Sequence, residues 1–207
     1  LTFQYAGFFD PDSSFDGLLE YRFCVTSAIH AASDCTIEAK GRALNEWKRL
    51  APAGFHEYRE LGLLHGHAYR VHVMAYNRAR LHTTLSSDGT IYDATAPLPG
   101  YVFDYTNLVG GEDARFTNES SILRYTWEPF SEAESNIVQY SIQLGTIVGR
   151  PTDNVMSAVT LAPDSTFFEF VAEAEIPSGT VVYAALTALN AAGLQATRMT
   201  NGVQVDT

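Results

Sequence analysis

Apolar and polar residues alternate along several short segments of the chain. In the segment at residues 69–76 one set of alternate positions is Tyr69, Val71, Val73 and Ala75, and the intervening set is more polar. Residues 1–5, 123–127 and 182–188 alternate in the same way. A period of two places successive side chains on opposite faces of a strand, so each segment is predicted to be a strand with one buried face. Because Gly, Pro, Asp and Ser separate these segments and no long helical period is present, we predict an all-β fold.

The chain contains an internal repeat. Residues 77–93, NRARLHTTLSSDGTIYD, align without a gap with residues 190–206, NAAGLQATRMTNGVQVD, at an offset of 113. Residues 63–69 match residues 176–182 at the same offset, whereas residues 20–27 and 1–8 match at offsets of 119 and 122. The offset changes only in turns, which tolerate changes in length. The sequence is therefore one β-module copied in tandem.

Length and repeat together predict two domains. A chain of 207 residues suits two domains of ordinary size. We place the boundary in ATAPLPG at residues 94–100, where two prolines stiffen a short connector, which gives modules at residues 1–96 and 97–207. The second module has the segment GYVFDYT available as a first strand, whereas the first module is expected to lack its first strand. We expect both ends to be cuts through a longer array of modules.

Two motifs resemble those of fibronectin type III domains. Trp127-Glu128-Pro129 resembles the Trp-x-Pro of the family's second strand. Residues 63–79, LLHGHAYRVHVMAYNRA, resemble its Leu-x-x-Gly-x-x-Tyr-x-Val-x-Val-x-Ala-x-Asn stretch. The resemblance covers nearly the whole chain and implies two tandem immunoglobulin-like (fibronectin type III-like) β-sandwich domains. It specifies function poorly, because one fold serves many functions.

The resemblance also assigns structural roles to aromatic residues. It implies that Trp127 fills the core of the second module and that the hydroxyl of Tyr69 bonds backbone at a corner of the first. Tyr5 stands at the position of Trp127 in the first copy, and Val182 stands at the position of Tyr69 in the second. Tyr183 has the opposite strand parity and is not expected to replace Tyr69. The expected core aromatic residues are Tyr5, Tyr21, Tyr69, Trp127 and Tyr140.

The two cysteines, Cys24 and Cys35, both lie in the first copy. Cys24 has the outward parity of its strand, which suits a cross-strand disulfide better than a core position. The even count and short spacing predict a Cys24–Cys35 disulfide, with two free thiols as the alternative. Asn118-Glu119-Ser120 is a glycosylation sequon, so Asn118 is a candidate glycosylation site. Both features predict a secreted or cell-surface location.

Charge is divided unevenly between the modules. Residues 1–96 carry 9 Lys and Arg against 11 Asp and Glu, whereas residues 97–207 carry 4 against 13. This acidity argues against nucleic acid and anionic membranes as partners. The sequence also contains no membrane-spanning run, so we expect no direct membrane insertion by this segment.

Three aspartates in the first copy, Asp10, Asp12 and Asp16, are calcium candidates because alternate carboxylates supply hard oxygen ligands. Their spacing departs from the EF-hand pattern, since Phe15 stands at the position of the sharp-turn glycine and Tyr21 at that of the closing glutamate. A polar turn explains the same residues, and we expect a turn here rather than a metal site.

Catalytic and cofactor motifs are absent from the sequence. His65 and His67 could present two imidazoles, but no further zinc ligand is fixed by spacing. The sequence has no Gly-x-Ser-x-Gly motif and no phosphate-binding glycine loop. We therefore expect neither an enzyme nor a cofactor-binding protein.

The resemblance favours a structural or adhesive role within a large extracellular or cell-surface repeat protein. The expected partners are neighbouring modules of the same chain and other protein chains, including self-assembly. The connector pattern DGTIYDATAPLPG resembles large repeat-bearing surface proteins, so a surface filament component is the narrowest placement. One alternative is a ligand-binding receptor ectodomain that uses Gly54, Phe55 and residues 107–112. A second alternative is a pair of accessory modules of a secreted enzyme.

Overall fold

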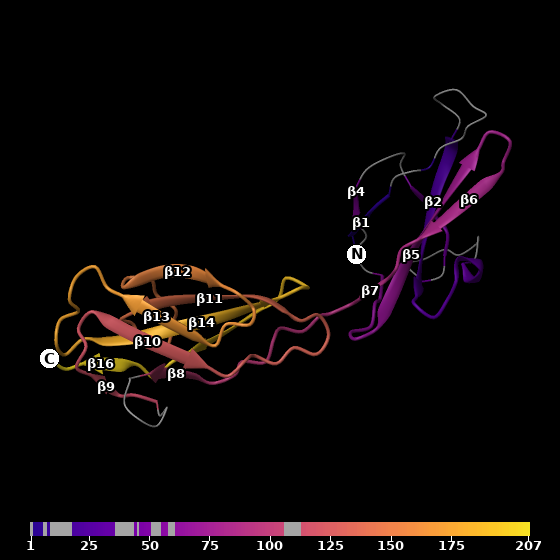
Figure 1. Cartoon of the computed structure of the whole chain (residues 1–207). Helices are drawn as coiled ribbons and strands as arrows, with labels where there is room; N and C mark the ends of the chain where they lie inside the picture. Colours follow the sequence, from indigo (N-terminus) through magenta and orange to yellow (C-terminus); the bar gives the residue numbers. More distant parts are fainter. Residues whose placement is uncertain are drawn as a thin grey trace. The chain divides into compact units, whose positions relative to one another are not determined.

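The computed structural model describes residues 2–5, 8, 18–35, 44, 46–50, 55–57, 61–105 and 113–207. The chain divides into two compact units, Leu1–Asp93 (unit 1) and Ala94–Thr207 (unit 2) (Figure 1). The sequence placed this boundary slightly later, after residue 96. Among the described residues the only helical segment is the 3-10 turn η1 (Ala32–Asp34), so the all-β prediction is confirmed.

Unit 2 contains two sheets. The strand order of the smaller sheet is β13-β10-β8, formed by β13 (Phe167–Val171), β10 (Ile122–Trp127) and β8 (Val102–Tyr105). The order of the larger sheet is β12-β11-β14-β16-β9, formed by β12 (Met156–Leu161), β11 (Ile137–Gly145), β14 (Val181–Asn190), β16 (Val203–Val205) and β9 (Phe116–Thr117). β15 (Gln195–Met199) pairs with β14. Every pairing is antiparallel except that of β16 with β9. Two such sheets with their inner faces apolar form a sandwich of the immunoglobulin-like kind.

Unit 1 repeats most of this arrangement. Its larger sheet has the order β3-β2-β5-β6, formed by β3 (Lys48–Leu50), β2 (Leu18–Ser27), β5 (Ala68–Asn77) and β6 (His82–Ser86), with β7 (Thr90–Ile91) also paired to β5. Its second sheet contains β1 (Thr2–Gln4) and β4 (Phe55–Glu57). Within the described residues, unit 1 has no counterpart of β8 or β9.

Strand register is the same in both units. On β5, His72 lies opposite Ser86, and on β14 Ala185 lies opposite Met199. Tyr69 likewise lies opposite Thr90, as Val182 lies opposite Val203. Each second-copy residue is 113 positions after its first-copy equivalent, which is the offset of the sequence repeat. The pairing therefore confirms that one β-module was copied in tandem.

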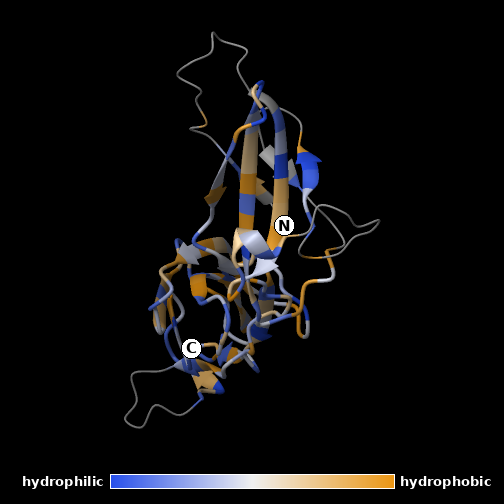
Figure 2. Cartoon of the chain, turned by 90° about the vertical axis from the view of Figure 1, so that its right-hand side faces the viewer, coloured by the Kyte–Doolittle hydropathy of each residue, from blue (hydrophilic) through white to orange (hydrophobic). Residues whose placement is uncertain are grey.

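The apolar parity of the central strands β5 and β14 lies in the core, as predicted. In unit 1 the inward residues of β5 are buried, and in unit 2 those of β14 are buried at the matching positions, Val182, Ala184, Leu186 and Ala188. Figure 2 shows hydrophobic and hydrophilic residues alternating along the long strands. Burying one face of each sheet removes apolar area from water, which is the main favourable term in folding.

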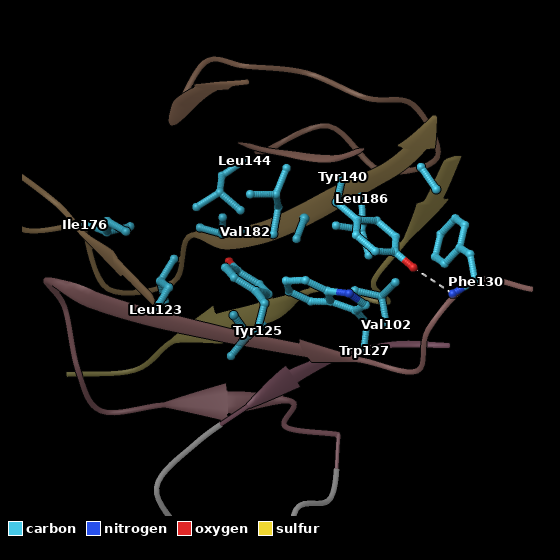
Figure 3. Packing of buried hydrophobic residues seen from close by; sticks show 14 of the residues in the cluster. Val102, Leu123, Tyr125, Trp127, Phe130, Tyr140, Leu144, Ile176, Val182 and Leu186 are labelled. Atoms are coloured by element: carbon cyan, nitrogen blue, oxygen red, sulfur yellow. Dashed lines mark hydrogen bonds between the residues drawn. The ribbon is translucent and has the colours of Figure 1, made fainter. Parts of the chain in front are cut away.

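Aromatic residues fill the core of unit 2 (Figure 3). Tyr125 and Trp127 of β10 are buried between the sheets, and the Trp127 ring lies 5.9 Å from that of Tyr140, centroid to centroid. The Tyr140 hydroxyl accepts a hydrogen bond of 2.9 Å from the Phe130 backbone N–H. This arrangement buries the ring while satisfying its polar end.

Two of the aromatic residues expected in the core of unit 1 are less deeply buried than Trp127 and Tyr140. Tyr5 and Tyr21 are half-buried at the edge of the core, with ring centroids 5.2 Å apart. Tyr5 therefore takes the strand position of Trp127 without filling the same volume.

The corner tyrosine occurs in unit 1 only. The Tyr69 hydroxyl accepts a 2.8 Å hydrogen bond from the Leu64 backbone N–H. In the second copy the position of Leu64 is Pro177, which has no N–H, and the position of Tyr69 is Val182, which has no acceptor. The N–H donor at the position of Leu64 and the hydroxyl acceptor at the position of Tyr69 are thus lost together. Tyr183 points elsewhere, with its ring beside Gly202, and does not replace Tyr69.

An asparagine closes the same hairpin turn in both units. The Asn77 carboxamide oxygen accepts a 2.9 Å hydrogen bond from the Leu81 N–H, and that of Asn190 accepts one of 2.8 Å from the Leu194 N–H. The backbone N–H of each asparagine donates to the carbonyl of the same leucine. Side chain and backbone together set the start of β6 and β15.

We predict that Asn77→Ala and Asn190→Ala destabilise their own units by different amounts. Asn77→Ala loses one side-chain bond in a half-exposed turn and should cost about 1 kcal/mol. The Asn190 Nδ2 also donates to the Thr95 carbonyl and the Glu132 carboxylate, so Asn190→Ala should cost about 2–4 kcal/mol. Amide hydrogen exchange of the whole chain, read at β5 and β14, measures both free energies of unfolding. Equal losses of unfolding free energy in the two units would contradict the stabilising role of the additional Asn190 hydrogen bonds.

Candidate functional sites

The disulfide joins β2 to the residue that follows η1. Cys24 and Cys35 form an S–S bond, with their Cα atoms 6.4 Å apart. Cys24 has the outward parity that the sequence indicated, but its exposed fraction is 0%, so outward parity does not mean exposure here. Cys35 is bonded to it and His72 lies directly opposite it on β5. The bridge therefore fixes the segment at residues 28–35 against the outer face of the sheet.

His72 is a buried histidine that the sequence analysis did not single out. Its Nδ1 lies 2.7 Å from Ser86 Oγ, and its Nε2 lies 2.9 Å from Thr26 Oγ1. Burial, with a smaller contribution from Arg70, lowers the pKa of His72, while Asp34 opposes the shift. Hydroxyl groups lie beside both ring nitrogens, so His72 ties β2 and β6 to β5, and the lowered pKa favours its neutral form. A Ser-His-Asp triad has the serine hydroxyl at Nε2 and a carboxylate at Nδ1, whereas the Nδ1 of His72 lies beside the Ser86 hydroxyl.

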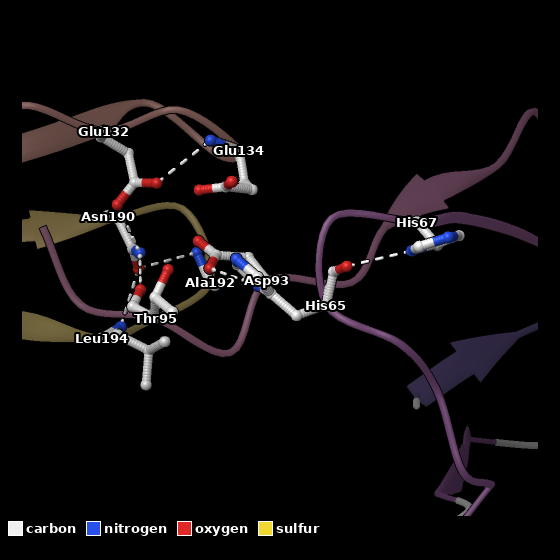
Figure 4. Close-up of polar contacts among 9 residues, drawn as sticks. All are labelled: His65, His67, Asp93, Thr95, Glu132, Glu134, Asn190, Ala192 and Leu194. Carbon is white, nitrogen blue, oxygen red and sulfur yellow. Dashed lines mark hydrogen bonds and ion pairs between the residues drawn. The ribbon is translucent and has the colours of Figure 1, made fainter.

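His65 and His67 do not converge on one point (Figure 4). The His67 Nδ1 lies 3.0 Å from the backbone carbonyl oxygen of His65, whereas the His65 Nδ1 lies 3.7 Å from the Asp93 carboxylate. The two rings therefore have different partners within unit 1.

Asn190 and its neighbours form a polar cluster in unit 2 (Figure 4). The carboxamide oxygen of Asn190 accepts from Ala192 and Leu194, and its Nδ2 donates to the Thr95 carbonyl at 3.1 Å and to the Glu132 carboxylate at 2.9 Å. The second carboxylate oxygen of Glu132 accepts from the Glu134 N–H. The buried Asn190 side chain thereby joins the turn between β14 and β15 to Thr95 of the connector and to Glu132 in the turn before β11.

Asp104 is a carboxyl group on the inward face of β8. Its exposed fraction is 0%, and it lies opposite Tyr125 on β10. One carboxylate oxygen accepts from the Gly202 N–H at 3.1 Å, and the Thr200 hydroxyl also hydrogen-bonds the group. Among the described residues, the other oxygen has no hydrogen-bond partner, and neither has the Tyr125 hydroxyl.

Burial raises the pKa of Asp104 to about 7. The hydrogen bonds from Thr200 and Gly202 act in the opposite direction, and the nearby charge of Asp113 adds to the rise. Asp113 accepts from the backbone N–H of Asp104 at 3.0 Å and from Asn201 Nδ2 at 2.6 Å. Asp104 therefore links β8 to the chain between β15 and β16. The sequence indicated the inward position of Asp104 only through its strand parity, which it shares with the apolar Val102.

The predicted glycosylation site lies at the surface of unit 2. Asn118 directly follows β9 and is exposed. The Glu119 N–H donates to Thr117 Oγ1 at 3.1 Å, and the Ser120 carbonyl accepts from the Ile176 N–H. The backbone around the sequon is held while the Asn118 side chain faces solvent.

Several predicted positions lie outside the described residues. They include the calcium candidates Asp10, Asp12 and Asp16, together with Gly54 and residues 107–112 of the receptor alternative. Phe55 begins β4. No helix in the described part of the chain is long and apolar enough to cross a bilayer.

We predict that unit 2 becomes more stable as the pH falls from about 8 to about 4. The folded-state pKa of Asp104, about 7, is above its usual 3.8, so its protonated form is favoured by folding and the stabilisation is lost as the pH rises through 7. The difference amounts to roughly 4 kcal/mol, at about 1.4 kcal/mol per pH unit. Asp104→Asn keeps an acceptor and should give unit 2 a flatter profile. Denaturant unfolding at several pH values tests this, and unchanged pH dependence in Asp104→Asn would refute it.

Comparison with solved structures finds a partial likeness to the crystal structure of chicken CNTN1 FN1-FN3 domains. The match has a TM-score of 0.46 and 16% identity, and it covers 91% of this chain and 56% of that one. The chain thus spans little more than half the length of that structure. No protein-family model and no curated protein matches the sequence. By its own strand order and register, the chain is a tandem pair of β-sandwich modules of fibronectin type III-like topology.

Proposed function

We propose that the chain is a non-enzymatic structural or adhesive module pair within a larger extracellular or cell-surface protein. The observation that carries the proposal is the parallel pairing of β9 and β16 in unit 2. β9 precedes β10 to β15 in the chain and β16 follows them, so this pair joins a strand near the beginning of the unit to its last strand.

The β9–β16 pairing suits a module that transmits force. The Gln204 N–H donates to the Arg115 carbonyl at 2.9 Å, and the Asp206 N–H donates to the Thr117 carbonyl at 2.8 Å. When the ends of the unit are pulled apart, parallel strands slide past each other, so these bonds are loaded together in shear rather than opened one at a time. Such a module would resist extension until the pair breaks.

Two covalent features support the proposed extracellular or cell-surface compartment. Disulfides persist in oxidising environments, and Cys24–Cys35 is buried beside His72 rather than exposed for redox exchange. The exposed Asn118 is open to glycan addition. The partners we propose are neighbouring modules and other protein chains, and a surface filament is the narrowest form of this role.

We predict that Asp206→Pro lowers the force at which unit 2 unfolds. The substitution removes the N–H that bonds Thr117, a loss of about 1 kcal/mol at equilibrium. Asp206→Ala is the matched control, because it keeps the N–H and the exposed side chain of Asp206 makes no contact that the pairing needs. Single-molecule pulling of the whole chain from both ends measures the unfolding force. Equal unfolding forces for Asp206→Pro and Asp206→Ala would argue against a β9–β16 pair that resists the pulling force.

We also predict one glycan at Asn118 when the chain is secreted from eukaryotic cells behind a signal peptide. Asn118→Gln should remove the mass increment and the shift on glycosidase treatment. Asn201→Gln is the control, because Asn201 is an asparagine of the same unit outside any sequon. Intact mass after alkylation without reduction should show no modified cysteine. A secreted chain with free thiols and no glycan would contradict the proposed compartment.

A further inference from the structure

An exposed aromatic residue lies next to the glycosylation sequon of unit 2. Phe116 of β9 precedes Asn118 by two positions, and the exposed fraction of Phe116 is 60%. Covering an aromatic ring of this exposure removes apolar area from water and is favourable. The position of Phe116 beside the sequon indicates which group can cover it.

Phe116 and Asn118 face the same side of β9. Thr117, between them, has an exposed fraction of 9%, whereas Phe116 and Asn118 are both exposed. This alternation is the period of two of an extended chain, in which every second residue faces the same side. Such residues lie about 7 Å apart. The first sugar ring on Asn118 therefore reaches the Phe116 ring.

Hydrogen bonds hold the backbone on both sides of Asn118. The Asp206 N–H donates to the Thr117 carbonyl at 2.8 Å, and the Glu119 N–H donates to Thr117 Oγ1 at 3.1 Å. The backbone that carries Phe116 and Asn118 is thus fixed before any sugar is attached. Little backbone entropy remains to be lost when a sugar packs on the Phe116 ring, which favours the contact.

The chemistry of the first sugar suits a phenylalanine ring. N-glycosylation links asparagine to N-acetylglucosamine, and one face of that pyranose ring presents axial C–H bonds rather than hydroxyl groups. These hydrogen atoms carry a small positive charge and complement the negative face of an aromatic ring. Phenylalanine has no polar group that needs a hydrogen-bond partner, so the sugar can cover it without loss.

We propose that the first N-acetylglucosamine of a glycan on Asn118 stacks on the Phe116 ring. The sugar covers the outward side of β9, the strand that pairs with β16. Because the sugar packs on the folded strand, the glycan stabilises the β9–β16 pair. This role rests on the proposed glycosylation of Asn118 and adds a structural purpose to it.

The test compares two forms of the whole chain secreted from eukaryotic cells that attach high-mannose glycans. One form carries a single N-acetylglucosamine on Asn118 after endoglycosidase trimming, and the other is Asn118→Gln, which carries no sugar. The Gln204 and Asp206 N–H groups donate to carbonyl groups of residues 115 and 117. Hydrogen exchange of these two amides, read by mass spectrometry, should be roughly fivefold slower with the sugar. NMR should show NOE contacts between the sugar and the Phe116 ring.

Phe116→Ala separates stacking from a general effect of the sugar. In the trimmed chain this substitution should remove the slowing of exchange, whereas in Asn118→Gln it should leave exchange about unchanged, since no sugar covers the ring. Phe116→Trp should keep the slowing, because a larger aromatic ring also stacks. Phe167→Ala is the matched control and should leave the effect of the sugar unchanged. Phe167 is an aromatic residue of unit 2 with a similar exposed fraction, 50%, on a strand that does not pair with β9.

The outcomes distinguish the stacking from the glycosylation on which it rests. Intact mass is measured first, and a secreted chain without sugar on Asn118 overturns both. A glycosylated chain overturns the stacking alone if the sugar slows exchange equally with and without the Phe116 ring, or if it slows exchange in neither. Absence of NOE contacts between the sugar and the Phe116 ring also overturns it.

Discussion

The central strand of each unit, β5 or β14, is the element on which the rest of its sandwich depends. β5 is hydrogen-bonded to β2 on one side and to β6 and β7 on the other, and β14 has the equivalent neighbours β11, β15 and β16. Its inward residues form one wall of the core, so a slip of one residue would turn that wall to solvent. The asparagine at its end, Asn77 or Asn190, closes the next hairpin and holds this register.

Much of this fold could be predicted from residues close together in sequence. Alternation located the strands, the gapless repeat gave the tandem organisation, and cysteine spacing gave the disulfide. What could not be predicted depends on strands far apart in sequence. Cys24 is buried because Cys35 and His72 lie against it. Asp104 is buried because Tyr125 and Gly202 lie against its carboxyl group. Arg80, whose φ is 67° where the second copy has Gly193, shows that even a local turn can lack its usual residue.

Residues that form a hydrogen bond in one copy have changed together in the other copy. Leu64 and Tyr69 form a hydrogen bond, and in the second copy Pro177 and Val182 remove donor and acceptor together. Ser87, by contrast, keeps a bond of Thr200: the Ser87 Oγ accepts from the Val71 N–H, as the Thr200 Oγ1 accepts from the Ala184 N–H. The duplication thus gives two modules of one design with different edges.

Both units use one sandwich in one register. Cross-strand proton contacts, measured by NMR on the whole chain, test it most directly at the hairpins β5–β6 and β14–β15. The account predicts a contact pair between His72 and Ser86 in unit 1 and, 113 residues later, between Ala185 and Met199 in unit 2. A second-unit pairing of Ala185 with Arg198 or Thr200 instead would place the inward faces of the copies out of step and contradict the account.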